Sequence, residues 1–177
     1  MPQHAGHFNF SFIYLVEPRP LQSLFYSNMV YKLQKKGGGL IQVGARGSQF
    51  ASVTVDVPSG KYKIKLIYHS GYLRCTQYYP PELHKTKFGC LSLAPLWRAN
   101  RINILVTDRR NQILLPKSKG YSHDGRISNS QFIIFNDIIE LNPGKVLHFW
   151  HKEDLEGVSE WDNDGASKFY AYAILQH

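Results

Sequence analysis

Long hydrophobic runs are missing from this sequence of 177 residues. None approaches the roughly 18 consecutive apolar residues that a membrane-spanning helix requires. The two cysteines do not form a C-x-x-C pair, which excludes a zinc ribbon and a thioredoxin-like redox motif. There is no G-x-S-x-G nucleophile turn, and no Lys-Ser/Thr pair directly follows the single glycine triplet, as a phosphate-binding loop requires. We therefore expect a protein that neither spans a membrane nor acts as an enzyme.

Cysteine is also scarce, and Cys75 and Cys90 enclose fourteen residues rich in Tyr, Pro and Lys. Two cysteines at the ends of an irregular loop indicate one disulfide, which would stabilise the fold by about 3 kcal/mol. Two free thiols in a cytosolic protein are the alternative. Residues 1–7 lack the basic and then apolar order of a secretory signal. The chain is thus cytosolic, a mature form, or a domain of a longer precursor.

Acidic residues are scarce over most of the chain and concentrated near its end. The first 150 residues hold nineteen bases and seven acids, and residues 151–177 hold two bases and six acids. The formal charge of +8 therefore divides into +12 and −4. A body this basic attracts polyanions such as sulfated glycans, nucleic acid or acidic matrix, unless the charge serves only solubility. Lys61, Lys63 and Lys65 alternate along one predicted strand, and ordinary surface lysines explain this pattern without specific nucleic-acid binding.

Helical periodicity is nearly absent, and only residues 21–33 and 91–97 could hold a helical turn. Alternation of apolar and polar residues dominates instead. We expect strands at residues 7–14, 52–57, 61–66, 101–106, 112–115, 132–135, 138–141, 145–150 and 168–175. Regularly spaced strands and turns predict one all-β domain over residues 1–177, an antiparallel two-sheet sandwich of jelly-roll type.

Turn residues suggest how some strands connect. The turn at 58–60 predicts a hairpin between residues 52–57 and 61–66, with the three lysines exposed and Tyr62, Ile64 and Leu66 facing the core. Residues 108–111 predict a second hairpin turn. The small residues of the last strand suit a closely packed central position.

The acidic segment, residues 153–164, holds six acids and separates the last two predicted strands. Carboxylate oxygens are the ligands that calcium prefers, and the expected calcium ligands are Glu160, Asp162 and Asp164. An EF-hand is excluded, because its twelfth position would be Ala171 and no helix is predicted on either side. An ordinary turn at residues 163–165 with solvated acids around it is the alternative.

The same segment combines aromatic, acidic and amide side chains, as sites that hold glycans do. An aromatic face packs against the C–H surface of a sugar, and carboxylates and amides bind its hydroxyls. The candidate ligand-binding residues are Trp150, His151, Glu153, Asp154, Trp161 and Asn163. A Trp150 buried in the core and a Trp161 packed against its own loop are the alternative. A glycosidase is disfavoured, because its two acids usually come from separate strands across a cleft.

Two stretches resemble a known domain. Residues 68–75 read YHSGYLRC and are followed by Gly89-Cys90, and residues 147–155 read LHFWHKEDL and are followed by SEWDNDG at 159–165. Together they resemble an extracellular domain of secreted proteins from corals and their relatives, including uncharacterised skeletal organic matrix proteins. The resemblance implies secretion, a disulfide between Cys75 and Cys90, and a matrix- or glycan-facing role.

These features favour a secreted, non-enzymatic, lectin-like module that binds glycans or other extracellular ligands, with calcium as the candidate cofactor. A structural protein of an acidic extracellular matrix or of a biomineral is the first alternative. A glycan-active enzyme is the second. The expected partners are glycans or acidic matrix, and a homo-oligomer is compatible with the sequence.

Overall fold

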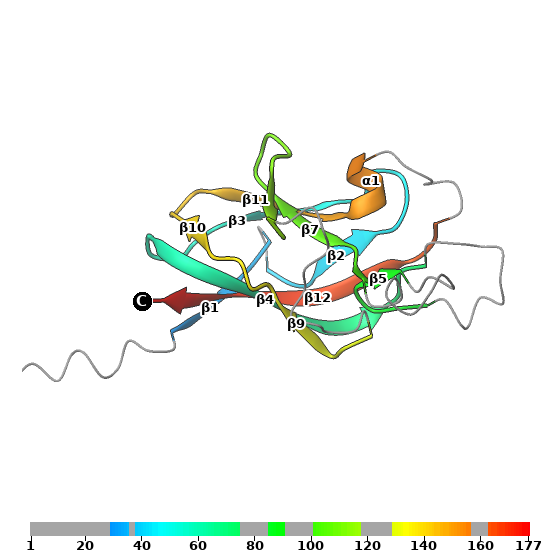
Figure 1. Cartoon of the computed structure of the whole chain (residues 1–177), viewed down its shortest axis with the longest axis horizontal. Coiled ribbons are helices and arrows are strands. Elements are labelled where there is room, and N and C mark those ends of the chain that lie inside the picture. The colour runs from blue at the N-terminus through cyan, green and yellow to red at the C-terminus, as the bar shows by residue number, and fades with distance from the viewer. Residues whose placement is uncertain (1–28, 36–37, 75–84, 91–100, 118–128, 157–162) are drawn as a thin grey trace, which may run out of the picture.

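The computed structural model describes residues 29–35, 38–74, 85–90, 101–117, 129–156 and 163–177, which form two antiparallel sheets packed face to face (Figure 1). The six-stranded sheet contains β1 (Val30–Leu33), β2 (Ile41–Gly44), β4 (Gly60–Gly71), β9 (Phe132–Ile134), β10 (Ile139–Leu141) and β12 (Ala166–Gln176). The four-stranded sheet contains β3 (Ala51–Thr54), β7 (Ile104–Thr107), β8 (Ile113–Leu115) and β11 (Val146–His151). A small sheet pairs β5 (Gly89–Cys90) with β6 (Arg101–Ile102), and α1 (Lys152–Glu156) follows β11. The predicted all-β, two-sheet sandwich is confirmed.

The two longest strands, β4 and β12, form the centre of the six-stranded sheet and pair along nearly their whole length. The other edge of β12 carries β1 and then β2, and the other edge of β4 carries β9 and β10. Ala171 and Ala173 of β12 are fully buried. The last strand is therefore central, as its small residues predict.

The four-stranded sheet has the order β3-β11-β7-β8. The predicted turn at 108–111 joins β7 and β8, which pair as a hairpin. Asp108 Oδ1 accepts hydrogen bonds from the backbone N–H groups of Arg110 (2.8 Å) and Gln112 (2.9 Å), and Asn111 adopts a φ of 61°. These are the local bonds by which Asp and Asn stabilise turns, so this hairpin is confirmed.

The core lies between the two sheets and follows the alternation of the strands. Tyr62, Ile64 and Leu66 of β4 are all fully buried, and their burial contributes about 1.5–3 kcal/mol for each side chain. The predicted register of this strand is therefore confirmed, although of the three lysines only Lys61 is exposed, and Lys63 and Lys65 are half-buried. Across the core, the rings of Phe149 and Phe169 meet edge to face at 5.9 Å and link the two sheets.

The hairpin predicted around residues 58–60 is wrong. β3 pairs with β11 in one sheet and β4 pairs with β12 in the other, so the chain crosses between sheets here. The loop at 142–144 makes the same crossing from β10 to β11. The two crossings run side by side, because Val55 bonds the backbone of Gly144 and Lys145. Val55 and Val57 stay buried through the bend, so alternation continues although the partner strand changes.

Two further expectations concern helices. Residues 30–33, within a stretch expected to hold a helical turn, form the edge strand β1, and the described helix, α1, instead lies in the acidic segment. The predicted strand at 7–14 and the predicted turn at 91–97 lie outside the described residues. No helix in the described ranges is long and apolar enough to cross a membrane.

Candidate functional site

Two segments that lie 90 residues apart in sequence meet beside the start of β12. Arg74 and Asp164 form an isolated antiparallel bridge, in which each backbone N–H donates to the other residue's carbonyl at 2.9 and 2.8 Å. One partner ends the described part of the YHSGYLRC stretch, and the other belongs to the SEWDNDG stretch. The structure thus brings together the two stretches that carry the family resemblance.

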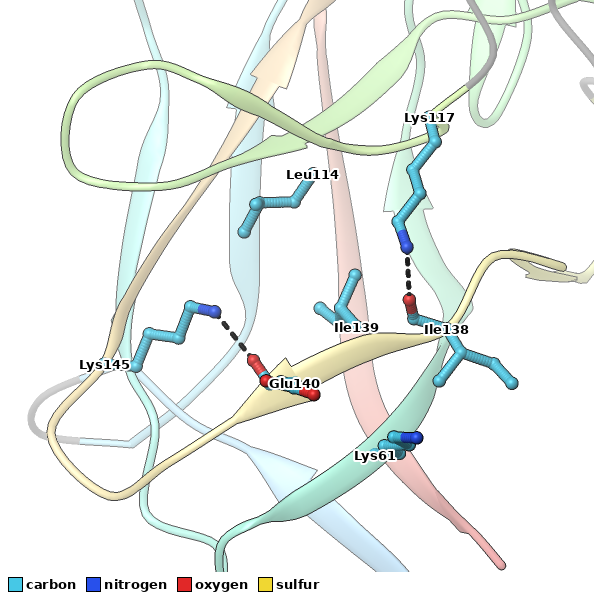
Figure 2. A pocket seen from close by; sticks show the side chains of 7 residues that line it. All are labelled: Lys61, Leu114, Lys117, Ile138, Ile139, Glu140 and Lys145. Carbon is cyan, nitrogen blue, oxygen red and sulfur yellow. Dashed lines mark hydrogen bonds between the residues drawn. The ribbon is translucent and has the colours of Figure 1, made fainter.

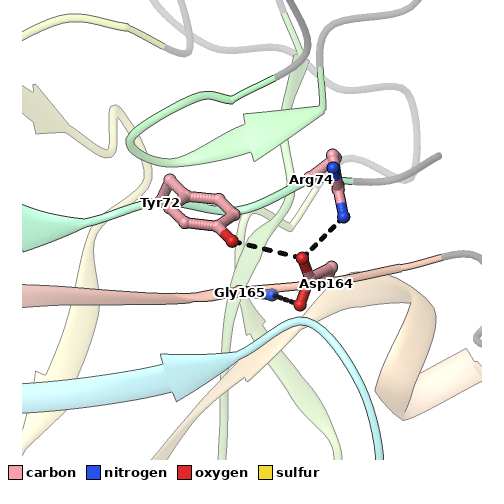
Figure 3. A network of polar contacts seen from close by, with 4 residues as sticks. All are labelled: Tyr72, Arg74, Asp164 and Gly165. Atoms are coloured by element: carbon pink, nitrogen blue, oxygen red, sulfur yellow. Dashed lines mark hydrogen bonds and ion pairs between the residues drawn. The ribbon is translucent and has the colours of Figure 1, made fainter. Parts of the chain in front are cut away.

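The side chain of Asp164 is held by three donors (Figure 3). Its Oδ2 accepts hydrogen bonds from Arg74 Nη2 at 2.6 Å and from the Tyr72 hydroxyl at 3.1 Å. Its Oδ1 accepts one from the backbone N–H of Gly165 at 2.7 Å. The Arg74 side chain is 14% exposed and that of Asp164 is 43% exposed. A carboxylate oxygen accepts about two hydrogen bonds, so Oδ1, which accepts one, keeps capacity for another.

Glycine geometry allows this close approach. Gly71 has a φ of +89° and Gly165 a φ of +88°, a region that other residues adopt only with strain. A Cβ on Gly165 would lie 2.5 Å from the Tyr72 carbonyl oxygen, and a Cβ on Gly71 would collide with the Ala166 carbonyl. Both glycines are therefore required to bring the segment around Tyr72 against the segment around Asp164.

Tyr72, Arg74, Asp164 and Gly165 together form the Asp164 cluster. Asn163, a predicted ligand-binding residue, directly precedes Asp164 and is fully buried. Neither its amide oxygen nor its amide nitrogen has a hydrogen-bond partner in the described part of the chain, and the Nε of Arg74 is also without one. A buried polar group without a partner costs about 1–3 kcal/mol, so such groups are uncommon and are found at functional sites. The region around Asp164 therefore contains hydrogen-bond donors and acceptors that its internal hydrogen bonds do not use.

Trp150, another predicted ligand-binding residue, is only 6% exposed. Its Nε1 donates a hydrogen bond to Thr107 Oγ1 at 3.1 Å, and the ring of Phe50 stacks on its face at a centroid distance of 4.2 Å. Phe50 itself is 42% exposed and also lies 4.7 Å from the His148 ring. Of these two stacked rings, Phe50 therefore presents the aromatic surface to solvent, and Trp150 lies buried beneath it.

His151 and Asp154, two more predicted ligand-binding residues, are buried. Burial lowers the pKa of His151 to about 4, so its imidazole is neutral at physiological pH. Asp154, in α1, accepts a hydrogen bond from the backbone N–H of Gln49 at 3.2 Å through Oδ2. The first turn of α1 is anchored as well, because the Lys152 N–H donates to the Asn103 carbonyl at 2.7 Å. The Asp154 side chain and the Lys152 backbone thus tie α1 to the segments around Gln49 and Asn103.

The remaining predicted site residues lie outside the described side chains, and their roles stay predictions. They are Glu153, Glu160, Trp161, Asp162, Cys75 and Cys90. In the described ranges, no three His, Cys, Asp or Glu side chains are close enough to hold a metal ion together. Asp164 is the one predicted calcium ligand whose side chain is described, and Arg74 occupies its Oδ2.

Sequence reasoning missed Tyr72, Arg74 and Phe50. Tyr72 and Arg74 are separated by two positions, which places them on one face of an extended segment, and this is the signal that could have selected them. Nothing local connects them to Asp164, because the contact joins distant parts of the chain. Phe50 carries no sequence signal, since it stands alone between polar residues and a short strand.

The chain was also compared with known proteins. No protein-family model matches it, and no curated protein matches it. Among solved structures, its fold is similar to that of AJLec, a lectin from the sea anemone Anthopleura japonica, with a TM-score of 0.68. The match covers 84% of this chain and 98% of AJLec, at 21% sequence identity. At this identity the similarity establishes that the two proteins share a β-sandwich fold.

Proposed function

We propose that this protein is a secreted, non-catalytic, lectin-like module that binds glycans at the end of the sandwich around Asp164. The observation that carries the proposal is the half-exposed Asp164 carboxylate, which three donors hold in one orientation. Two further facts support it. The fold is shared with a lectin, and the acidic segment ends at this carboxylate.

The chemistry suits sugar hydroxyls. A hydroxyl donates one hydrogen bond, and the open position on Asp164 Oδ1 accepts one. Because Arg74 and Tyr72 already fix the carboxylate, binding costs little side-chain entropy, and this preorganisation raises affinity. Hydrogen bonds to a charged acceptor are about twice as strong as neutral ones. Glu153 and Trp161 are the further contacts that we propose, whereas Asn163 is fully buried and is not among them.

Calcium belongs to the proposal as the candidate cofactor. Calcium takes six to eight oxygen ligands, and carboxylates can supply one oxygen each. The one open position on Asp164 Oδ1 fits a monodentate calcium ligand, and with calcium bound it would be taken by the ion in place of a sugar hydroxyl. Glu160 and Asp162 would then supply the negative charge, since the Arg74 guanidinium already balances Asp164. The readout is thermal stability, which millimolar calcium should raise in the wild-type protein and not in Asp162→Asn.

The deciding experiment is a glycan array probed with calcium and with a chelator. The wild type should bind a discrete set of glycans. Tyr72→Phe, which removes one hydroxyl beside the carboxylate, should weaken binding several-fold, and Asp164→Asn should weaken it at least tenfold. Asp56→Asn is the matched control, because Asp56 is an exposed acid between β3 and β4, away from this cluster. Circular dichroism checks that each variant is folded.

Two results would contradict the proposal. One is discrete glycan binding that survives in Asp164→Asn, which places the site elsewhere. The other is binding to every polyanion with a strong dependence on salt and no sugar specificity. That second result would favour the alternative, a structural protein of an acidic extracellular matrix.

A further inference from the structure

A pocket of about 490 Å³ lies between the open edges of the two sheets (Figure 2). β8 is the edge strand of the four-stranded sheet, and β10 lies at the edge of the six-stranded sheet. The pocket is lined by three lysines, one acid and aliphatic side chains, among them Lys61, Lys117, Lys145, Glu140, Leu114 and Ile138. Lys61 lies at the start of β4, whereas Tyr72 and Arg74 of the Asp164 cluster follow the other end of that strand.

Two of the lysines are already positioned. Lys117 Nζ donates a hydrogen bond to the Ile138 carbonyl at 2.8 Å, and Lys145 Nζ donates one to the Glu140 carbonyl at 2.7 Å. Figure 2 shows both side chains reaching toward β10 from the neighbouring segments. An ammonium group has three donors, so each retains two for a ligand. Lys61 is the cross-strand partner of Glu140 and adds a third positive charge.

The pocket carries a positive surplus. Three lysines and one glutamate give its lining a formal charge of +2. None of the three ammonium groups forms an ion pair with a carboxylate in the described part of the chain. Asp137, the other acid nearby, accepts the backbone N–H of Lys117 at 2.9 Å. The cationic groups are therefore available to an anion from outside.

Protection of the sheet edge explains part of this arrangement. Lysines are commonly placed at edge strands, where they prevent pairing with another chain. Here Lys145 binds the carbonyl of Glu140 in β10, and Lys117 binds that of Ile138, which directly precedes β10. Edge protection accounts neither for Lys61, which covers no carbonyl, nor for a pocket of this volume between the sheets.

We propose that this pocket binds a sulfate or carboxylate group of an acidic polysaccharide. The aliphatic side chains of Leu114 and Ile138, the latter 40% exposed, suit the C–H surface of a sugar ring. Among the described residues, no aromatic side chain lines the pocket, whereas proteins that hold single-stranded nucleic acid stack bases on aromatic rings. The surplus of twelve positive charges over the first 150 residues would draw such a polymer to the molecule. This binding site is independent of the function proposed for the Asp164 cluster.

Calorimetric titrations of the full chain test the proposal with four probes: a sulfated oligosaccharide, an unsulfated uronic-acid oligosaccharide, a neutral oligosaccharide and a single-stranded oligonucleotide. The key variant replaces Lys61, Lys117 and Lys145 by Gln. The matched control replaces Lys32, Lys35 and Lys168 by Gln. These three lysines are exposed and lie outside the pocket, so the control loses the same charge without changing the lining. The pocket variant should lose at least tenfold in affinity for an acidic oligosaccharide, and the control less than threefold. The ratio between the two acidic probes tells whether sulfate or carboxylate is preferred.

Two single variants sharpen the result. Glu140→Gln removes the negative charge from the lining and should strengthen binding about twofold to threefold, more than diffuse attraction would gain from the loss of an acid outside the pocket. Asp164→Asn should leave binding of the acidic oligosaccharide unchanged, so failure of this inference and failure of the proposed function are distinguishable.

Three outcomes overturn the inference. Equal losses in the pocket and control variants would mean diffuse electrostatic attraction. Tighter binding of the oligonucleotide than of either acidic sugar would mean a nucleic-acid site. Absence of binding to both acidic probes, with a folded pocket variant, would leave the lysines as edge protection alone.

Discussion

The Asp164 cluster and the lysine pocket hold their charged groups in opposite ways. At the cluster, Asp164 is fixed by two side chains and a backbone N–H, and two glycines with positive φ allow the segments to meet. At the pocket, the long side chains of Lys117 and Lys145 each make one hydrogen bond to a backbone carbonyl, that of Ile138 just before β10 and that of Glu140 in β10. The first arrangement depends on backbone geometry, whereas the second depends on exposed side chains.

This difference has a consequence for recognition. A carboxylate in one fixed orientation can distinguish hydroxyls by their position, so the cluster suits selective binding. Lysine ammonium groups are mobile point charges, so the pocket suits the charge of a ligand more than its shape. It follows that substitutions at the cluster should affect stability and binding together, and those at the pocket should affect binding alone.

The largest effect is expected from Gly165→Ala. The new Cβ would lie 2.5 Å from the Tyr72 carbonyl oxygen, and alanine would have to adopt the left-handed φ of +88°, so we expect a loss of about 4 kcal/mol in the free energy of unfolding. Gly47→Ala is the matched control, because Gly47 has a φ of +72° and nothing within 4 Å of its Cβ position. That variant should lose only about 1 kcal/mol. Urea denaturation measures both, and equal losses would show that the close approach to Tyr72 costs nothing.

The second-largest effect is expected from acid, which should lower the free energy of unfolding through His151. Burial lowers the pKa of His151 to about 4, while the unfolded chain takes up a proton near the ordinary value of about 6.5. The free energy of unfolding is therefore unaffected by this histidine above pH 6.5. It falls by about 3 kcal/mol in total as the pH is lowered toward 4, because only the unfolded chain takes up the proton. Unfolding free energies between pH 7 and pH 4.5 measure the slope. His151→Leu should flatten most of it, and His148→Gln, at a ring only partly buried, should flatten little. An unchanged slope in His151→Leu would contradict the assignment.

The Arg74–Asp164 ion pair should contribute about 1–2 kcal/mol, between the values for exposed and buried pairs, because Asp164 is 43% exposed. A double-mutant cycle with Arg74→Leu and Asp164→Asn isolates this coupling energy. A coupling energy near zero would mean that Arg74 does not fix the carboxylate.

The smallest effect is expected at the lysine pocket. Lys117→Gln removes one hydrogen bond at an exposed edge and should change the free energy of unfolding by less than about 0.5 kcal/mol. Thermal and chemical denaturation of this variant and of Lys168→Gln should coincide. A clear loss in Lys117→Gln alone would assign the lysine mainly to holding the edge of the sandwich.

The sequence predicts faces better than partners. Alternation through residues 61–66 identified which side chains of β4 enter the core, and Asp108 and Asn111 identified the turn between β7 and β8. Alternation carries no information about the neighbouring strand, because any pairing that buries the same face satisfies it. The chain therefore crosses between sheets at 58–60, where a hairpin was expected.

The candidate site was predictable only in part. The cluster of acids drew attention to Asp164 and Asn163, and the structure places both beside Arg74. The charge that the structure places against Asp164 is that of Arg74, from the basic first 150 residues. This contact joins residues 90 positions apart, so no local pattern could reveal it. Likewise, the ring of Phe50, which directly precedes β3, stacks on Trp150 of β11. These two residues are distant in sequence, so no local pattern reveals this contact.

An NMR titration with the best glycan from the array tests the proposed site most directly. In a protein of 20.4 kDa, backbone amide shifts locate the ligand residue by residue. We expect the largest shifts at Tyr72, Arg74, Asp164 and Gly165, small shifts at the lysine pocket, and no saturable shifts in Asp164→Asn. Shifts concentrated on another part of the sandwich, or unchanged affinity in Asp164→Asn, would contradict glycan binding at the Asp164 cluster.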